Sequence, residues 1–439
     1  MSYIPSTPSE QEEMLKKIGV KNFEELIKSI PEEVRVKGNL KIADGISEYE
    51  AIKEIREIAK NNLSTDDIIS FLGGGSYDHY IPSVISSIIT RSEFITAYTP
   101  YQAEVSQGTL QAIYEYQTMI CKITGMDVAN ASMYDGGSAA AEASLLAVSH
   151  KNRKQIVVCE PFNPNYIEVI KTICNGTEIE TLVISHKNGL IDIEKLKSTI
   201  SDKTAGVLVQ YPNYFGYIDE VDEISKIVKG NNSLFIVSVD PISLGILLPP
   251  AEFGADIVIG EGQPLGIPQN FGGPYLGIFA VKQELIRKIP GRLSGMTIDK
   301  NGERGFVLTL QTREQQIRRE KATSNICTNQ GLMMLASTIY MALMGKQGLK
   351  EVAELCIQKS HYLADEISKL NKFSLMYNNP FFKEFLIKTP ISSKLIVDKL
   401  IEKNIFAGIP IDDNSLLVAV TEKRTKKEMD YFVSLLKEF

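Results

Sequence analysis

Short runs of β-branched and aliphatic residues, separated by amphipathic stretches, constrain the fold of this 439-residue chain more than any other feature. Helical patterns at 193–200 and 221–229 fill two of the gaps between these runs. Because continuous apolar strands that alternate with helices are typical of mostly parallel sheets covered on both faces, the sequence predicts an αβα domain. The runs lie at residues 155–159, 181–185, 205–210, 234–239, 256–259 and 276–281.

The chain changes character on both sides of this region. We predict an N-terminal helical extension over residues 1–60, a large αβα domain over 61–329 and a small α+β domain over 330–439. In the last part, a long helical pattern precedes shorter strands and helices, at 329–370, 373–377, 384–388, 392–403, 415–419 and 426–438.

Composition and charge exclude several classes of function. The formal net charge of −7 argues against nucleic acid as a partner and gives no support for an anionic membrane surface. The most apolar long stretch, 233–260, contains Asp240 and Glu252, which are too costly for a membrane span. No secretory signal is visible, so we expect a cytoplasmic protein. The four histidines are far apart and no CxxC pair occurs, so we predict no metal site.

Asp240 follows the strand predicted at 234–239, within VDPISLG. One interpretation is a loop-capping Asp before a proline. In an aminotransferase-type fold, however, an Asp at this place pairs with the pyridine nitrogen of a vitamin B6 cofactor, and a lysine after the next strand forms the Schiff base. Here no lysine lies between Lys229 and Lys282, and the segment reads GEGQPLG, with Gln263 near the lysine position. Because an amide cannot form an imine, either the fold differs or this is a degenerate half of an enzyme.

The sequence MYDGGS precedes an alanine-rich helix and is a candidate for the anion-binding part of a cofactor pocket. Small residues at a helix N-terminus leave backbone N–H groups open to an anion. A tight turn before a close-packed helix explains the pattern equally well. The candidate vestigial cofactor pocket consists of Asp135, Gly136, Gly137, Ser138 and Asp240.

Two further segments are rich in polar aromatic residues. The first, FLGGGSYDHYIP at 71–82, contains His79, and its three glycines allow unusual backbone angles or a close approach by a ligand. The alternative is an interdomain loop stabilised by tyrosine hydrogen bonds. The second, FITAYTPYQAEVSQG at 94–108, has little apolar patterning, which favours a surface loop or the lining of a cavity.

The last candidate, RREKATSNICT at 318–328, precedes the small domain. Arginines among small hydroxyl and amide side chains suit phosphate or carboxylate recognition. A helix that ends in a basic turn, followed by a capped helix start, is the alternative. The candidate residues are Arg318, Arg319, Thr323, Ser324, Asn325 and Thr328.

Together these segments resemble one family. The motifs quoted above, with ADIVIGEGQPLGIPQNFGGPYLG and REQQIRREKATSNICT, are similar to subunit 1 of glycine dehydrogenase (decarboxylating), the P-protein of the glycine cleavage system. The similarity covers nearly the whole chain and is weakest after about residue 371. It implies the pyridoxal-phosphate-dependent transferase fold type I, like that of aspartate aminotransferase.

The resemblance also implies a division of labour. Subunit 2 carries the Schiff-base lysine and holds pyridoxal phosphate covalently, whereas this subunit lacks it, in agreement with Gln263. The two subunits form a heterotetramer, a dimer of heterodimers, or a single heterodimer, with active sites at their interfaces. That complex decarboxylates glycine, passes the aminomethyl group to the lipoyl group of H-protein and releases CO2. This chain would then have no catalytic residue of its own and no covalent cofactor.

From position and chemistry we expect the 318–328 residues to contribute to the partner's phosphate pocket. We expect His79, Tyr98, Thr99 and Tyr101 to line the approach of glycine or the lipoyl arm. Two alternatives stay open: a non-catalytic scaffold or regulatory subunit of the same fold, and a stand-alone pyridoxal-phosphate enzyme.

Overall fold

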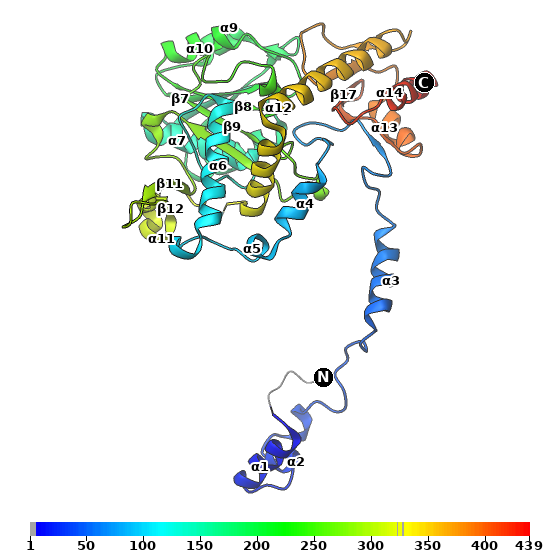
Figure 1. Ribbon diagram of the computed structural model, residues 1–439. Helices are drawn as coiled ribbons and strands as arrows, with labels where there is room; N and C mark the ends of the chain where they lie inside the picture. Colours follow the sequence, from blue (N-terminus) through cyan, green and yellow to red (C-terminus); the bar gives the residue numbers. More distant parts are fainter. Residues whose placement is uncertain (1–5, 323, 327–328) are drawn as a thin grey trace. The chain divides into compact units, whose positions relative to one another are not determined.

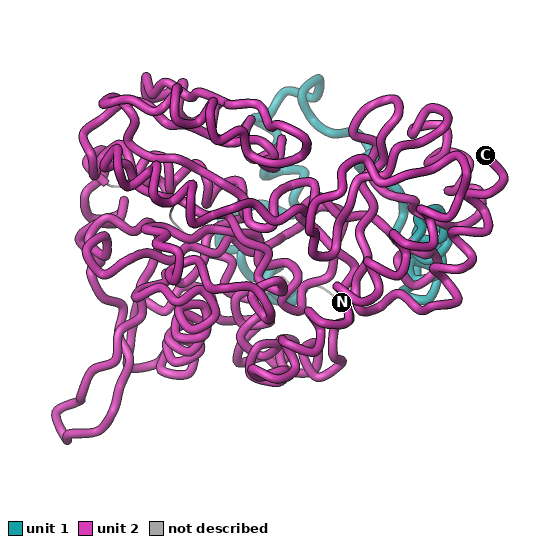
Figure 2. The backbone as a smooth tube through the Cα atoms, turned by 90° about the horizontal axis from the view of Figure 1, so that it is seen from above, with its two compact units in different colours: residues 1–63 teal, residues 64–439 magenta. Residues whose placement is uncertain are grey.

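The structure is a computed structural model that describes residues 6–322, 324–326 and 329–439. Its internal contacts divide the chain into two compact units, Met1–Leu63 and Ser64–Phe439 (Figure 2). Each unit is described by itself.

The first unit consists of short helices, as predicted. It contains α1 (Pro8–Ile18), α2 (Phe23–Leu26) and α3 (Glu48–Ala59), with a 3-10 turn at Glu32–Val34. Both longer helices begin with a capping box, in which a hydroxyl and a glutamate satisfy each other's backbone N–H groups; the pairs are Thr7 with Glu10 and Ser47 with Glu50. No described side chain of this unit is buried.

The second unit is built on a seven-stranded sheet. The strand order is β2-β10-β9-β8-β7-β3-β4, and all neighbours run parallel except β10, which is antiparallel to both β2 and β9. Each predicted run corresponds to a strand within two residues at either end. The bounds are β2 (Val128–Ala129), β3 (Gln155–Cys159), β4 (Glu180–Ile184), β7 (Thr204–Tyr211), β8 (Leu234–Val239), β9 (Ile257–Glu261) and β10 (Gly277–Val281).

Helices cover both faces of this sheet (Figure 1). Successive strand residues point to opposite faces, so Val157 packs in one core and its neighbour Val158 in the other. The first core is closed by α6 (Gln107–Thr124), α9 (Ile193–Thr199), α10 (Val221–Gly230) and α12 (Gly331–Ser368). The second is closed by α7 (Gly136–Lys151) and α8 (Pro164–Gly176). This confirms the αβα layering and the expected fold type.

A four-stranded antiparallel sheet of order β13-β14-β17-β16 forms the C-terminal part. Its core includes Phe71 stacked on Phe432, with ring centroids 4.4 Å apart. Phe71 belongs there because β1 (Ile69–Ser70) pairs with β15 (Ile405–Phe406). The three-part division stays a prediction. The remaining bounds are β13 (Ser374–Leu375), β14 (Glu384–Lys388), β16 (Ile409–Asp412), β17 (Ser415–Ala419), α13 (Ser393–Ile401) and α14 (Lys426–Leu436).

The long helix α12 joins the two sheets. Tyr340, near its start, packs in the first core of the large sheet, and Ile367, near its end, packs in the core of the small sheet. The backbone breaks at Gly345, with φ 59° and ψ −172°, so the predicted continuous helix consists of two segments.

The sequence did not predict the hairpin of β11 (Leu293–Ile298) and β12 (Arg304–Thr309), which packs on α6 through Leu110, Phe306 and Leu308. The other short elements are α4 (Ser83–Ile89), α5 (Ser92–Ile95), α11 (Gln315–Arg318), β5 (His186–Lys187) and β6 (Leu190–Ile191). Within the described residues, no helix has the length and apolar character needed to cross a bilayer.

Candidate functional site: a degenerate cofactor pocket

Asp240 and Gln263 lie at the carboxyl ends of two neighbouring parallel strands. Asp240 directly follows β8, and Gln263 lies two residues beyond β9. The register pairs Val239 with Gly260 and therefore brings the two ends together. Ligands of doubly wound sheets bind at this edge, so the structure places the predicted pair where a cofactor would be held.

The Gln263 amide has all its hydrogen-bonding groups satisfied inside the chain. Its Oε1 accepts from the Tyr77 N–H at 2.9 Å, and its Nε2 donates to the carbonyl oxygens of Tyr77 (3.0 Å) and Ile267 (2.7 Å). The residue is only 2% exposed. Gln263 therefore connects the segment after β9 to the 71–82 loop through buried hydrogen bonds. Its amide has no nitrogen that could form an imine.

Asp240 has a partner that sequence reasoning missed. The Nζ of Lys383 lies 2.7 Å from Asp240 Oδ2, 3.0 Å from His79 Nε2 and 3.4 Å from the centroid of the Tyr77 ring. The Lys383 side chain is 1% exposed. Fully buried lysines are rare unless paired. A signal existed in the sequence, because a Lys–Glu pair interrupts the apolar run FFKEFLI at 381–387.

The glycine-rich 71–82 loop connects the two sheets. The Gly74 N–H donates to Glu384 Oε1, and the Tyr77 hydroxyl donates to Glu384 Oε2, both at 2.7 Å. Gly74 has φ +71°, which favours glycine. Asp78 forms ion pairs with Lys423 and Arg424, each at 2.8 Å. These contacts agree with the interdomain-loop alternative for this motif.

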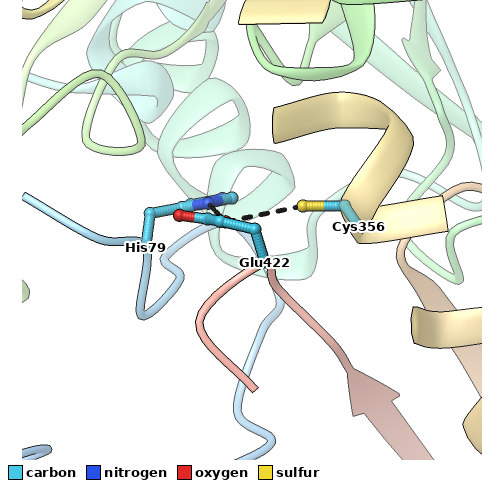
Figure 3. A group of neighbouring side chains, drawn as sticks. All are labelled: His79, Cys356 and Glu422. Atoms are coloured by element: carbon cyan, nitrogen blue, oxygen red, sulfur yellow. Dashed lines mark hydrogen bonds and ion pairs between the residues drawn. The ribbon is translucent and has the colours of Figure 1, made fainter. Parts of the chain in front are cut away.

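His79 belongs to a buried cluster with Glu422 and Cys356 (Figure 3). Its Nδ1 lies 2.6 Å from Glu422 Oε2, and Cys356 Sγ lies 3.6 Å from the same oxygen. Burial alone would raise the pKa of Glu422, but the imidazole and the Tyr80 N–H bind the carboxylate and lower that pKa to about 2. Burial raises the pKa of the Cys356 thiol, which disfavours the metal-binding thiolate. Together with the Lys383 ammonium, this favours a hydrogen-bonded cluster over a metal site.

At the N-terminus of α7, the N–H groups of Gly136 and Ser138 are bound within the chain. Asp135 caps the helix by accepting from the Ser138 N–H at 2.6 Å. The Gly136 N–H donates to Glu261 Oε2 at 3.0 Å, while Glu261 Oε1 accepts from the N–H groups of Gln263 (3.0 Å) and Leu276 (2.9 Å). Burial raises the pKa of Glu261 to about 8 against the effect of these donors. The predicted anion site thus already holds a carboxyl group.

Two cavities show how much room is left. The space between Asp240 and Glu261 has a volume of about 20 Å³. A larger cavity of about 850 Å³ opens beside it, with Asp135, Glu160 and Glu261 in its wall and no lysine or arginine among its described lining residues. Three acidic side chains and no described lysine or arginine in its wall make this cavity a poor match for the phosphate of pyridoxal phosphate.

The predicted 94–108 loop contacts Arg292, which sequence reasoning also missed. Its Nη2 donates to the Tyr101 hydroxyl at 3.4 Å, its guanidinium lies 5.6 Å from the Tyr101 ring centroid, and its Nη1 donates to Asn329 Oδ1 at 3.2 Å. Arg292 is 3% exposed, and its Nε has no hydrogen-bond partner within the described part of the chain. Arg292 therefore joins the 94–108 loop to the segment that precedes α12.

The candidate residues of these segments are mostly exposed. Tyr98 is 85% exposed and Tyr101 53%, while Thr99 is half-buried. Arg318, Arg319 and Asn325 are exposed, and Ser324 is half-buried beside Glu142. Thr323 and Thr328 lie outside the described residues. Among the described candidates of these segments, none is hydrogen-bonded to Asp240 or Gln263.

Comparisons with known proteins agree with this geometry. The chain matches the glycine cleavage system P-protein family over residues 1–436. It is 57% identical to a probable glycine dehydrogenase (decarboxylating) subunit 1 of Chloroherpeton thalassium over the full length of both chains. It is 52% identical to the protein of that description from Carboxydothermus hydrogenoformans, over 99% of each. A crystal structure of glycine decarboxylase (P-protein), in inhibitor-bound form, superposes with a TM-score of 0.89 at 37% identity over 100% of both chains. Glutamate decarboxylase of Lactobacillus brevis shares the fold, with a TM-score of 0.70 at 13% identity, over 92% of this chain and 95% of that one.

Proposed function

Since this chain belongs to the glycine cleavage system P-protein family, we propose that it completes a two-subunit glycine decarboxylase without holding the cofactor itself. It is a component of glycine dehydrogenase (decarboxylating), and its relatives' name, subunit 1, implies a partner subunit. In this proposal subunit 2 carries pyridoxal phosphate on a lysine. The complex decarboxylates glycine, transfers the aminomethyl group to the lipoyl group of H-protein and releases CO2 in the cytoplasm.

One observation carries the proposal. At the strand end where this fold type has its Schiff-base lysine, Gln263 is 2% exposed and both polar atoms of its side chain are bound by the backbone. Covalent attachment there would need both a different side chain and a rearranged loop. The cofactor therefore has to be held by another polypeptide.

The exposed apolar side chains around the 94–108 loop support a partner surface. The loop contacts the β11–β12 hairpin through the turn at Ala103–Val105. Monomeric proteins seldom expose many large apolar side chains in neighbouring segments, so this region suits a subunit interface. The exposed residues are Ile95, Tyr98, Tyr101, Val105, Met296, Ile298 and Ile317.

In the complex, the proposal assigns two roles to this region. Tyr98, Thr99 and Tyr101 line the approach of glycine or the lipoyl arm, and the basic segment that begins at Arg318 contributes to the partner's phosphate pocket. The exposed guanidinium groups of Arg318 and Arg319 support the second role, because arginine binds phosphate in a bidentate manner. For His79, the buried contacts described above favour a structural role, and its part in the approach stays a prediction.

Reconstitution tests the proposed function. The purified chain, mixed with the lysine-bearing subunit 2 and lipoylated H-protein, should restore exchange of bicarbonate with the glycine carboxyl group. Each subunit alone should give little exchange. Strong exchange by this chain alone would overturn the proposal.

Variants separate an active-site contribution from a scaffold role. Tyr101→Ala and Arg318→Ala should lower exchange by the complex while size-exclusion chromatography shows normal assembly. Tyr431→Ala, on an exposed tyrosine of α14, and Arg287→Ala, on an exposed arginine, are matched controls and should retain activity. Full activity of the first two variants in an intact complex would favour the scaffold alternative.

A further inference from the structure

We propose that two resident side chains, those of Lys383 and Glu261, occupy the places that the pyridine nitrogen and the phosphate of pyridoxal phosphate would take. They keep the pocket of this chain filled and closed to the cofactor even without covalent attachment. This inference goes beyond the missing lysine. A pocket that had merely lost its lysine would remain open to the cofactor, whereas a filled pocket would stay closed if the lysine were restored.

A cation already lies next to Asp240. In this fold type the Asp after the strand pairs with a protonated pyridine nitrogen. Here the Lys383 ammonium supplies the positive charge and the N–H donor, 2.7 Å from Asp240 Oδ2. Burying this carboxylate without a partner would be costly, so Lys383 compensates it permanently. His79 and the Tyr77 ring hold the ammonium from its other sides.

The N-terminus of α7 is the place where a phosphate group would bind. Helix N-termini bind phosphate through free backbone N–H groups. At α7, the Gly136 N–H is bound by Glu261 and the Ser138 N–H by Asp135. The Tyr166 ring packs so closely on Gly136 that an added Cβ there would lie 2.5 Å from its hydroxyl oxygen. Carboxyl oxygens and a tyrosine ring therefore lie where phosphate oxygens would bind.

Little space is left beside Asp240. Between Asp240 and Glu261 the cavity measures about 20 Å³, and a second space beside Asp240 and Lys383 measures about 10 Å³. Each is close to the room that one water molecule occupies. An aromatic ring with its substituents does not fit in either space, and the neighbouring cavity of about 850 Å³ has neither Asp240 nor Lys383 in its lining.

The ion pair of Lys383 and Asp240 also connects the two sheets. Lys383 directly precedes β14 of the small sheet, and Asp240 directly follows β8 of the large one. Glu384, the next residue, binds Gly74 and Tyr77 of the loop that lies between them. The resident ion pair therefore fixes the relative position of the two sheets without any bound ligand.

The test restores the missing lysine and asks whether the cofactor enters. The full-length chain with Gln263→Lys is incubated with pyridoxal phosphate and reduced with borohydride, and labelled lysines are located by mass spectrometry. Lys388, exposed on β14, serves as the internal reference for adventitious labelling. We expect labelling at position 263 to be no higher than at Lys388. Preferential labelling at position 263 would overturn the proposal.

Removing the resident cation should then open the pocket. The combined variant Gln263→Lys with Lys383→Ala is expected to gain labelling at position 263 over the single variant. Equal labelling of the two folded variants would contradict the role of Lys383.

The wild-type chain provides a measurement that does not depend on these variants folding. Equilibrium dialysis with pyridoxine 5′-phosphate, which has no aldehyde and cannot react with surface lysines, should show no saturable binding. Saturable one-to-one binding would overturn the proposal. These experiments use this chain alone, so their failure is distinguishable from failure of the proposed function, which is judged by exchange activity of the complex.

Discussion

The ammonium nitrogen of Lys383 lies 2.7 Å from Oδ2 of Asp240, and both side chains are almost entirely removed from water. The two residues are far apart in sequence and adjoin strands of different sheets. Their contact compensates the buried charge of Asp240 from within the chain.

We expect this ion pair to be energetically coupled. Lys383→Met and Asp240→Asn should each lower the free energy of unfolding by about 3–5 kcal/mol, because each leaves a buried charge without its partner. The double variant should lose clearly less than the sum, measured by urea denaturation. Lys388→Met, on an exposed lysine of β14, should change the stability by no more than about 0.5 kcal/mol. Additive losses would contradict the coupling.

Gly136→Ala tests the packing at the start of α7. Its Cβ would lie 2.5–2.9 Å from three atoms of the Tyr166 ring system, so we expect a loss of about 1–3 kcal/mol in the free energy of unfolding. Gly176→Ala at the end of α8 is the matched control, since an added Cβ meets no atom within 4 Å there. That change should be neutral or stabilising by up to about 1 kcal/mol. A neutral Gly136→Ala would argue against the close Tyr166 contact.

Glu142 makes the stability depend on pH. Burial in α7 raises its pKa from 4.5 to about 7, although a hydrogen bond with Ser324 acts in the opposite direction. Between these values the folded chain binds more protons than the unfolded chain, so the free energy of unfolding should fall as pH rises from 4.5 to 7. The contribution amounts to about 3 kcal/mol.

Glu142→Gln should remove this part of the pH dependence, which urea denaturation at a series of pH values would measure. Glu402→Gln, on the exposed glutamate that ends α13, is the control and should leave the slope unchanged. An identical slope in wild type and Glu142→Gln would contradict the burial argument.

Much of the fold could be predicted from the sequence because the signals are local. The strands of the large sheet are continuous β-branched runs, and the helices between them have clear periodicity, so their positions followed directly. The β11–β12 hairpin escaped prediction because its strands are partly exposed and contain glycine and polar residues. The break at Gly345 escaped because a single glycine does not indicate whether a helix continues.

The candidate site was predictable only in part. Asp240 and Gln263 could be found because strand order brings consecutive strand ends together. The roles of Lys383 and Arg292 could not be assigned, since their partners are distant in sequence. Charged residues in otherwise apolar runs, such as the pair at 383 and 384, are the sequence signal that points to buried pairing.

The most direct test locates the cofactor in the assembled enzyme. The reconstituted complex, loaded with pyridoxal phosphate, is reduced with borohydride, and its two chains are separated and analysed by mass spectrometry. We predict that the stoichiometric label is on the partner subunit, with this chain carrying only scattered labelling of exposed lysines. A stoichiometric label on one lysine of this chain would contradict the account.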